Sequence, residues 1–437
     1  MAVKVDVYLW GTKVGSLGYD KSGKMGEISV FEFTAKVMNE GINISPLLMN
    51  SQIQQHHFTN ISYRTFKGLA GVFSDSLPDK FGDQLIDIYM AEKGIVGQDI
   101  TPLDRLMYIG DRGMGAIEYV PNEVKSSEDD FHALDITMLN ELASLTNNNQ
   151  SILAQKLHES ESQSQALKFI RIGASAGGAR SKALVAKKDA VLKDGTVNHG
   201  VEYNYYLLKF DTDDNSDRDG FDAKGMTRVE YVYSIIARRC GINIPNTEFI
   251  VNGNDFHFLI ERFDRIKVNN KLEKLHYVSW CGIAHAHRDE TGAYSYEQLS
   301  LVCKQLGLGA DTLKEVFTRC VFNIVGVNQD DHTKNFGFLM NKDLEWSLSP
   351  AFDMTYSYDP SGKWTSKHQI KLNRKQSDFV REDLLNFAIH CNLTRLQASN
   401  IINLVIQEFA DFESLADEYN VPKALKMTIS KNLRRHL

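Results

Sequence analysis

The stretch VGVNQDDHTKNFGFLM, residues 325–340, places two adjacent carboxylates, a histidine, a lysine and an asparagine between apolar segments. We predict that residues 321–327 form the buried end of a helix and residues 336–340 a short apolar strand. The polar residues NQDDHTKN then form a loop whose side chains are held by the scaffold beneath it. Because functional residues are often found on such loops, this one is the first candidate site.

The spacing within this loop suits phosphoryl transfer. That reaction uses a carboxylate to orient the acceptor hydroxyl, together with oxygen ligands that hold magnesium against the phosphates. In the protein-kinase loop H-R-D-L-x-x-x-N the asparagine stands five residues after the aspartate, as Asn335 does after Asp330. The spacing therefore selects Asp330 over Asp331. Asp353 ends a second apolar run, 23 residues after Asp330, and is the candidate for a second magnesium ligand.

The block before this loop offers two elements for a nucleotide. Lys209 stands late in the apolar strand candidate YNYYLLKFD, where an unpaired ammonium would be costly to bury. A phosphate, or a glutamate such as Glu230 on the following predicted helix, would relieve that cost. The second element is RIGASAGGARSK, residues 171–182, which we predict to be a glycine-rich turn between strands. Its backbone amides would line an anion site, and its candidate residues are Gly173, Gly177, Gly178 and Lys182.

Length and composition limit the architecture. A chain of 437 residues exceeds the roughly 250–300 at which a single core stops growing, so we expect several domains. The formal net charge of −7 argues against a basic surface over the whole chain. Five scattered cysteines without a C-x-x-C pair suggest neither a zinc ribbon nor a disulfide framework. With no long apolar run, we expect a cytoplasmic protein outside the membrane.

Periodicity predicts the order of the elements. Short antiparallel strands are expected over 3–33, followed by helices and then a domain joint near 121–134. A strand-rich block followed by a helix-rich block suggests two lobes. The expected helices are 81–95, 101–110, 229–240, 278–287, 295–306, 311–327, 382–391, 395–411 and 422–435, and the expected strands of the middle block are 168–172, 182–187, 203–210, 246–251 and 256–260.

Six motifs in this order resemble the HipA-like serine/threonine kinases, the toxin partners of bacterial HipBA-type modules: GASAGGARSKALV, YYLLKFD, VEYVYSIIARRCGINIP, LIERFDR, NQDDHTKNFGFL and LSPAFDM. LPDKFGDQLI and RLMYIGDRGMGAIEY are similar to that family's N-terminal domain. The resemblance covers nearly the whole chain. It implies an α+β fold, in which a bilobal protein-kinase-like part with an all-helical C-lobe carries an extra N-terminal β-rich domain. The expected domains are an N-terminal domain (1–130), a kinase N-lobe (131–265) and a kinase C-lobe (266–437).

The resemblance also implies roles for residues that match the family motifs. Asp330 would be the catalytic aspartate, Asn335 and Asp353 the magnesium ligands, and Lys209 the contact to the ATP phosphates. Ser175 matches a loop serine that the family phosphorylates on itself, and phosphate charge there would repel ATP. The remaining candidates for the nucleotide site are Glu261 and Phe263 at the hinge that binds adenine, Asp264 for the ribose and His332 for the neighbourhood of the active site.

As a function, the resemblance implies an ATP- and Mg2+-dependent kinase that phosphorylates a serine or threonine of a translation-related protein. The best-known target in the family is an aminoacyl-tRNA synthetase, the glutamyl enzyme. A helix-turn-helix antitoxin of the HipB type would be the partner, and DNA would be reached only through it. Two alternatives stay open. One is a non-catalytic subunit that binds an antitoxin and helps to repress transcription, and the other is a kinase of small molecules.

Overall fold

The computed structural model describes residues 3–20, 28–95, 97–122, 132–148, 150–157, 163–175, 180–211, 216–217, 220–221 and 223–437. The chain forms two compact units. The first comprises Met1–Asn215, Glu261–Val278 and Leu339–Glu345, and the second comprises Ser216–Ile260, Ser279–Phe338 and Trp346–Leu437. Both units contain helices and strands. No helix in the described part of the chain is long and apolar enough to cross a membrane.

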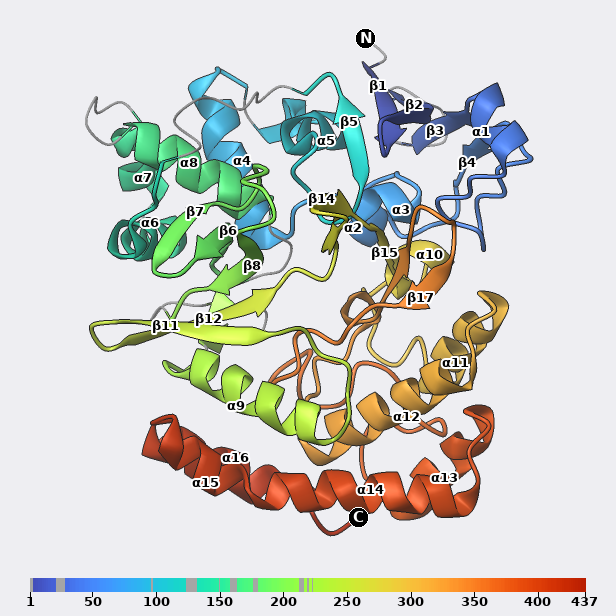
Figure 1. Cartoon of the computed structure of the whole chain (residues 1–437), viewed down its shortest axis with the longest axis vertical. Helices are drawn as coiled ribbons and strands as arrows, with labels where there is room; N and C mark the ends of the chain where they lie inside the picture. Colours follow the sequence, from blue (N-terminus) through green and yellow to red (C-terminus); the bar gives the residue numbers. More distant parts are fainter. Residues whose placement is uncertain are drawn as a thin grey trace. The chain divides into compact units, whose positions relative to one another are not determined.

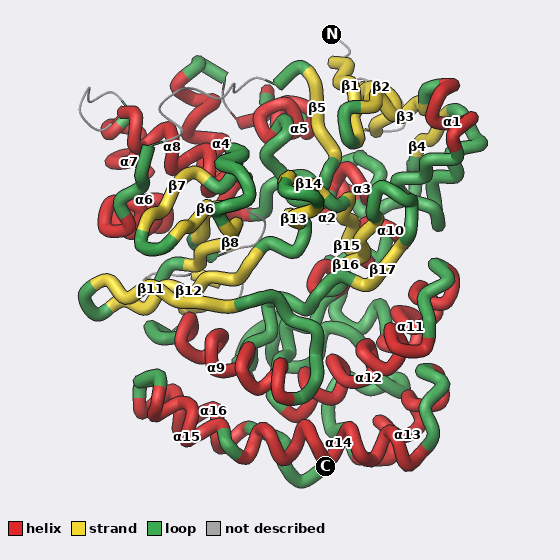
Figure 2. Tube along the Cα trace, viewed as in Figure 1, coloured by secondary structure: helices red, strands yellow, loops and turns green. Residues whose placement is uncertain are grey.

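The N-terminal part of the first unit is a five-stranded antiparallel sheet, drawn in yellow in Figure 2. Its inward side chains, such as Val5 and Val7, are fully buried, as alternation predicted. Trp10 and Gly11 form the two-residue turn between its first strands, both with positive φ, a conformation that matches the twist of a hairpin. The strands, in the order β4-β3-β2-β1-β5, are β1 Val3–Leu9, β2 Thr12–Asp20, β3 Ile28–Phe33, β4 Gln55–His57 and β5 Ile117–Val120.

Helices α4, α6, α7 and α8 of the first unit pack together (Figure 1). The helices predicted at 81–95 and 101–110 are confirmed as α4 and α5, whereas α6 and α7 were not predicted. The described helices of this unit are α1 Ala35–Glu40, α2 Tyr63–Phe66, α3 Gly71–Ser74, α4 Lys80–Glu92, the 3-10 turn η1 Gly97–Asp99, α5 Pro102–Ile109, α6 Ile136–Asn148, α7 Gln150–Lys156 and α8 Gln163–Ala174.

Helix α8 corrects one prediction. Residues 168–172, predicted as a strand, belong to this helix, because a short apolar run does not reveal its period. Gly173 lies in its last turn, where an added Cβ would meet Leu85 Cδ1 of α4 at 2.6 Å. The glycine thus permits close packing of the two helices. The stretch 171–182 connects a helix to a strand, not two strands, and Gly177 and Gly178 lie outside the described residues.

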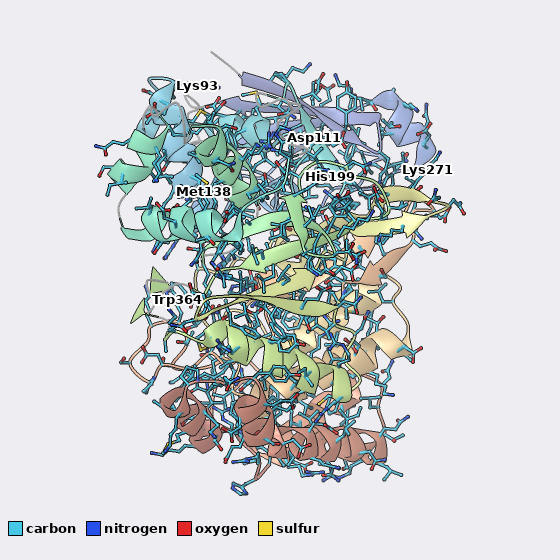
Figure 3. The ribbon with its side chains drawn as sticks, turned by 60° about the vertical axis from the view of Figure 1, so that its left-hand side comes forward. Lys93, Asp111, Met138, His199, Lys271 and Trp364 are labelled. Atoms are coloured by element: carbon cyan, nitrogen blue, oxygen red, sulfur yellow. The ribbon has the colours of Figure 1, made fainter. Side chains whose placement is uncertain are left out.

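The middle block contains the other strands predicted for it. In the first unit, β6 pairs antiparallel with β7 and with β8, and β13 forms a hairpin with β14 whose Lys271 is labelled in Figure 3. In the second unit, β11 pairs with β12 and β9 with β10. Their bounds are β6 Lys182–Lys188, β7 Val191–Asp194, β8 Asn204–Lys209, β9 Ser216–Asp217, β10 Gly220–Phe221, β11 Thr247–Asn252, β12 Asp255–Glu261, β13 Arg265–Val268, β14 Lys271–Lys274 and β15 His276–Ser279.

The helices predicted beyond residue 278 are confirmed, although α10 is shorter than expected and α15 was not predicted. Short strands β16 Gly337–Met340 and β17 Trp346–Leu348 accompany them. The C-terminal part is therefore helix-rich without being entirely helical. The helices are α9 Met226–Arg239, α10 Trp280–Ala284, α11 Tyr296–Gln305, α12 Ala310–Val325, the 3-10 turn η3 Thr333–Asn335, α13 Arg381–His390, α14 Arg395–Ala410, α15 Phe412–Glu418 and α16 Lys423–Asn432.

The part of the core that supports the loop of residues 328–335 is aromatic. Tyr233 of α9, Phe322 of α12 and Phe409 of α14 are fully buried and contact one another, with ring centroids 4.9–5.9 Å apart. Gly326 ends α12, and a Cβ there would meet Phe409 Cζ at 2.4 Å. This glycine lets α14 approach the end of α12 closely (Figure 1). The loop that follows therefore starts from a rigid support.

Candidate active site

The loop that follows α12 is held by its backbone. Val327 has φ 54°, and a β-branched residue rarely adopts this left-handed conformation unless its surroundings enforce it. Val327 O accepts a hydrogen bond from Ser357 N at 3.1 Å, and Ser357 O accepts one from Gln329 N at 2.9 Å. The start of the loop is thus paired with a segment 30 residues further along the chain.

The two adjacent aspartates have different surroundings. Asp331 is 1% exposed, and its carboxylate accepts hydrogen bonds from Tyr296 Oη, His368 Nδ1 and Gln369 N, each at 2.8 Å. Burial, followed by the neighbouring Asp331, raises the pKa of Tyr296 well above its usual value, so this hydroxyl remains a donor. Asp331 is therefore a scaffold group. Asp330 is only partly buried, which supports the selection of Asp330 made from the spacing.

Asp330 is held at both its backbone and its side chain. Its Oδ1 accepts a hydrogen bond from Gln369 Nε2, and its carbonyl oxygen accepts one from Asn335 Nδ2 at 2.8 Å. Because the Asn335 amide donates through nitrogen, its Oδ1 is the atom left to serve as a ligand. An amide oxygen is a suitable ligand for magnesium.

Asp353 is connected to the same loop through Asn328. The Asn328 Nδ2 group donates to Asn323 Oδ1 at 3.0 Å and to the carbonyl oxygen of Asp353 at 3.3 Å. Asp353 has φ 53°, the second left-handed non-glycine residue of this neighbourhood. The structure thus brings the backbones of Asp330, Asn335 and Asp353 together, and their residue types fit a magnesium ion whose remaining ligands are phosphate oxygens.

His332 is buried, and its backbone nitrogen donates to the carbonyl oxygen of Asp330 at 2.9 Å. Its place next to the candidate site follows from this bond, while a contact of its ring with a nucleotide stays a prediction. The sequence interpretation missed Tyr296, His368 and Gln369. They are separated from the aspartates by 35–39 residues, and no local pattern marks them.

In the first unit, two lysines stand opposite each other. Lys182 of β6 and Lys209 of β8 are direct partners in the antiparallel ladder, and both are buried. Like charges directly opposite on one sheet face repel each other, and burial makes each costlier. A phosphate placed near the two lysines would be attracted by both charges. Glu230 is a buried residue of α9, and its pairing with Lys209 stays a prediction.

Ser175 follows α8 and is 7% exposed. Its hydroxyl donates to Arg171 O at 2.9 Å, as in a continuing helical turn. Arg171 is itself anchored, since its guanidinium is bonded to the buried Asp194. The Ser175 hydroxyl is thus engaged in this conformation, and its phosphorylation would require this turn to open.

The predicted hinge is held by a backbone hydrogen bond and a ring contact, but Asp264 does not fit the role predicted for it. Arg262 N donates to Tyr205 O at 2.7 Å, and the Phe263 ring lies 5.8 Å from that of Tyr277. Asp264 is fully buried, and its carboxylate accepts from both guanidinium groups beside it, those of Arg262 and Arg265. With its oxygens occupied and no exposed surface, Asp264 takes a structural role in place of a ribose contact. Glu261, half-buried, and Phe263 stay candidates for the adenine site.

The charges around Asp264 join the hinge to the N-terminal motif GDRGMG. Gly115 N donates to Asp264 Oδ2 at 2.7 Å, and Arg262 and Arg265 donate to the carbonyl oxygens of Gly113 and Gly115. A Cβ at Gly115 would meet Tyr277 N at 2.9 Å, so only glycine permits this approach. Burial alone would raise the pKa of Asp264, but the two arginines lower it to about 2.

Comparison with known proteins identifies two family matches within the chain. Residues 174–412 match the family described as HipA-like C-terminal domain, and residues 5–120 match the HipA N-terminal domain. A protein of Haemophilus influenzae, provisionally named a kinase, is 20% identical over 235 residues, which are 48% of this chain and 68% of that protein. A second provisionally named kinase, from Sinorhizobium fredii, is 24% identical over 220 residues, 46% of this chain and 52% of that protein.

Among solved structures, the chain is similar to the HipA protein of Shewanella oneidensis MR-1, determined in complex with HipB and operator DNA. The TM-score is 0.68 with 15% sequence identity, and the match covers 99% of this chain and 97% of that one. At this identity the likeness concerns the fold. It confirms the predicted α+β class, with an N-terminal β-sheet domain and a kinase-like region.

Proposed function

The chain belongs to the HipA-like family, and from this membership we propose that it is an ATP- and Mg2+-dependent protein kinase acting on serine or threonine hydroxyls. The observation that carries the proposal is the difference between the adjacent aspartates. Asp331 is buried as a scaffold group, while Asp330 stays partly exposed, five residues before an asparagine whose amide oxygen is left as a ligand. An accessible aspartate followed five residues later by an asparagine is the arrangement of the protein-kinase catalytic loop.

In the proposed reaction Asp330 orients the acceptor hydroxyl. The hydroxyl oxygen forms a bond to the γ-phosphorus of ATP as the bond from that phosphorus to the β–γ bridging oxygen breaks, and ADP leaves with the electron pair. The carboxylate of Asp330 receives the hydroxyl proton late in this step. Bound magnesium, held by Asn335 and Asp353, would supply neutralisation of the phosphate charge.

The nucleotide would be bound chiefly through the first unit. Lys209, with Lys182 opposite it in the ladder, would neutralise charge on the phosphates. The backbone at Glu261 and Phe263 would receive the adenine, and His332 would line the neighbourhood of Asp330.

Ser175 is the proposed site of self-inactivation. Its hydroxyl is bonded to Arg171 O in a buried turn, so a phosphate group, with its charge and volume, would not be accommodated without unwinding the end of α8. Phosphorylation would therefore unwind this turn, and the added charge would oppose the binding of ATP phosphates.

The proposed partners follow from the family. Since the Shewanella HipA protein was crystallised with HipB and operator DNA, we infer a cytoplasmic helix-turn-helix antitoxin as partner, with DNA reached only through it. The proposed substrate is a translation-related protein such as an aminoacyl-tRNA synthetase. Co-purification with the product of a small neighbouring reading frame would test the first point, and phosphoproteomics of a cell extract the second.

The decisive experiment incubates the purified chain with Mg2+ and γ-labelled ATP and maps phosphate by mass spectrometry, with Asp330→Asn as the control. Phosphate on Ser175 or on an added protein, absent in the control, is the expected result. Tight antitoxin binding without any transfer would favour a co-repressor subunit. Transfer to metabolites alone would favour a small-molecule kinase.

A further inference from the structure

We propose that Gln369 is a positioning residue for the transfer step, holding the carboxylate of Asp330 in place, and that Asp331 and His368 hold Gln369. This inference rests on the proposed function and extends it to a residue outside the sequence motifs. Gln369 follows Asp330 by 39 residues and lies in the long loop between β17 and α13, whose Trp364 is labelled in Figure 3.

Both adjacent aspartates bind the same distant residue. Gln369 Nε2 donates to Asp330 Oδ1, while Gln369 N donates to Asp331 Oδ1 at 2.8 Å. The scaffold carboxylate thus fixes the backbone of the residue whose side chain fixes the catalytic candidate. Gln369 is 4% exposed, so water competes little for this amide.

The segment that carries Gln369 is rigidly attached. His368 is fully buried, donates to Asp331 Oδ2 and packs against the Phe379 ring at 5.3 Å. Ile370, next to Gln369, is also buried. Lys371 pairs in both directions with the start of α11, since its nitrogen donates to Tyr294 O and its carbonyl oxygen accepts from Tyr296 N. Gln369 is thus presented by a fixed backbone, as a positioning group requires.

A neutral amide suits this task. A carboxylate offers about four lone-pair positions, so the bond from Gln369 can orient the group while using only one of them. A cation in the place of Gln369 would hold Asp330 equally well but would weaken it as a proton acceptor.

A merely structural glutamine would give a different result, and the chain contains a matched control. Gln376 supports the same segment. Its side-chain Nε2 donates to His368 O at 2.8 Å, and its backbone carbonyl oxygen accepts from His368 N. Its side-chain amide thus bonds the backbone of His368 and not the carboxylate of either aspartate. Methionine matches glutamine in length and volume without donating a hydrogen bond, so Gln369→Met and Gln376→Met remove one bond each from the same segment.

The experiment measures kcat and KM for ATP, together with the thermal midpoint, for both variants of the full chain. Gln369→Met should lower kcat about 10- to 100-fold, the loss expected for one hydrogen bond to a charged group. Its KM for ATP should stay within about twofold and its thermal midpoint close to that of Gln376→Met, since each loses one bond of similar strength. Gln376→Met should keep kcat within about twofold, because it leaves Asp330 oriented.

Two results would overturn the inference without touching the proposed function: an active wild type whose Gln369→Met variant keeps its kcat, or equal losses of kcat in both variants. A wild-type chain that binds ATP but transfers no phosphate would instead overturn the proposed function, and the role of Gln369 with it.

Discussion

Asp264 at the hinge and Asp331 in the candidate loop are both almost completely buried aspartates, yet their partners differ. Asp264 is surrounded by two guanidinium groups and a backbone amide, so its charge is balanced within a structural junction. Asp331 receives a tyrosine hydroxyl, a histidine and a backbone amide, and its neighbour Asp330 remains partly exposed. The carboxylate of Asp264 thus joins parts of the fold through two cations, whereas that of Asp331 fixes the residues that surround its reactive neighbour Asp330.

The roles of the two adjacent aspartates are distinguished most clearly by replacing each with asparagine. Asp330→Asn should lower phosphoryl transfer about 100- to 10,000-fold, because the proton acceptor is lost, while ATP affinity and thermal stability change little. Transfer from γ-labelled ATP and calorimetric ATP binding measure the two properties.

Asp331→Asn should behave in the opposite way with respect to folding. Its side chain has one acceptor oxygen for three donors, so the thermal midpoint should fall clearly below that of Asp330→Asn. A nearly normal transfer rate in Asp330→Asn, or equal thermal midpoints in the two variants, would contradict the division of roles.

Removal of the hinge carboxylate should affect stability, not chemistry. Asp264→Ala leaves Arg262 and Arg265 buried without their counter-charge and should lower the free energy of unfolding by about 3–5 kcal/mol. Denaturant titration of the full chain measures this change. The control is Asp417→Ala, which breaks an exposed ion pair with Lys426 and should cost no more than about 1 kcal/mol. Similar losses in both variants would argue against the junction described for Asp264.

Acid should weaken the first unit in two stages. Burial lowers the pKa of His276 to about 4, below the unfolded value of about 6.5. The unfolded chain therefore takes up this proton first as the pH falls. The free energy of unfolding should decrease by roughly 3 kcal/mol between about pH 6.5 and pH 4. Because the pKa of Asp264 is lowered in the folded protein, the free energy of unfolding should decrease further as pH falls from about 4 towards 2.

His276→Gln tests the first stage. The glutamine amide can replace the bond from His276 Nε2 to Ile44 O without titrating, so thermal midpoints measured between pH 7 and pH 4 should decline less steeply than in the wild type. An unchanged slope would mean that His276 does not determine how stability depends on pH between pH 7 and pH 4.

The smallest effect is expected for the phosphate contact. Lys209→Met should raise the Kd for ATP about tenfold, because it removes one of the two lysines that would make charge-assisted contacts with the phosphates. Lys193→Met on β7, where the lysine lies over the Tyr203 ring, is the matched control and should leave the Kd unchanged. Isothermal titration distinguishes them, and equal affinities in both variants would remove Lys209 from the nucleotide site.

The sequence by itself determined the elements with strong periodicity, such as β1, β8, α12 and α14, and the spacing of Asp330 and Asn335 within one loop. These features depend on residues that are close in the chain, where side-chain period and local hydrogen bonding suffice. The prediction failed at 168–172, where five apolar and basic residues do not distinguish a strand from α8. Helices α6 and α7 were not predicted either, although α6 places Leu139, Leu142 and Ala143 at helical spacing on a buried face.

The spacing selected Asp330, but only the tertiary structure decided that Asp331 is a buried scaffold group and which residues hold the two aspartates. The partners of Asp331 and Asp330 come from α11 and from the loop that contains Gln369, and Gly115 reaches Asp264 from 149 residues away. Whether a carboxylate is solvated, paired with cations or held by neutral donors depends on which distant segments pack against it. Burial then sets its charge environment, and a local motif contains no information about those neighbours.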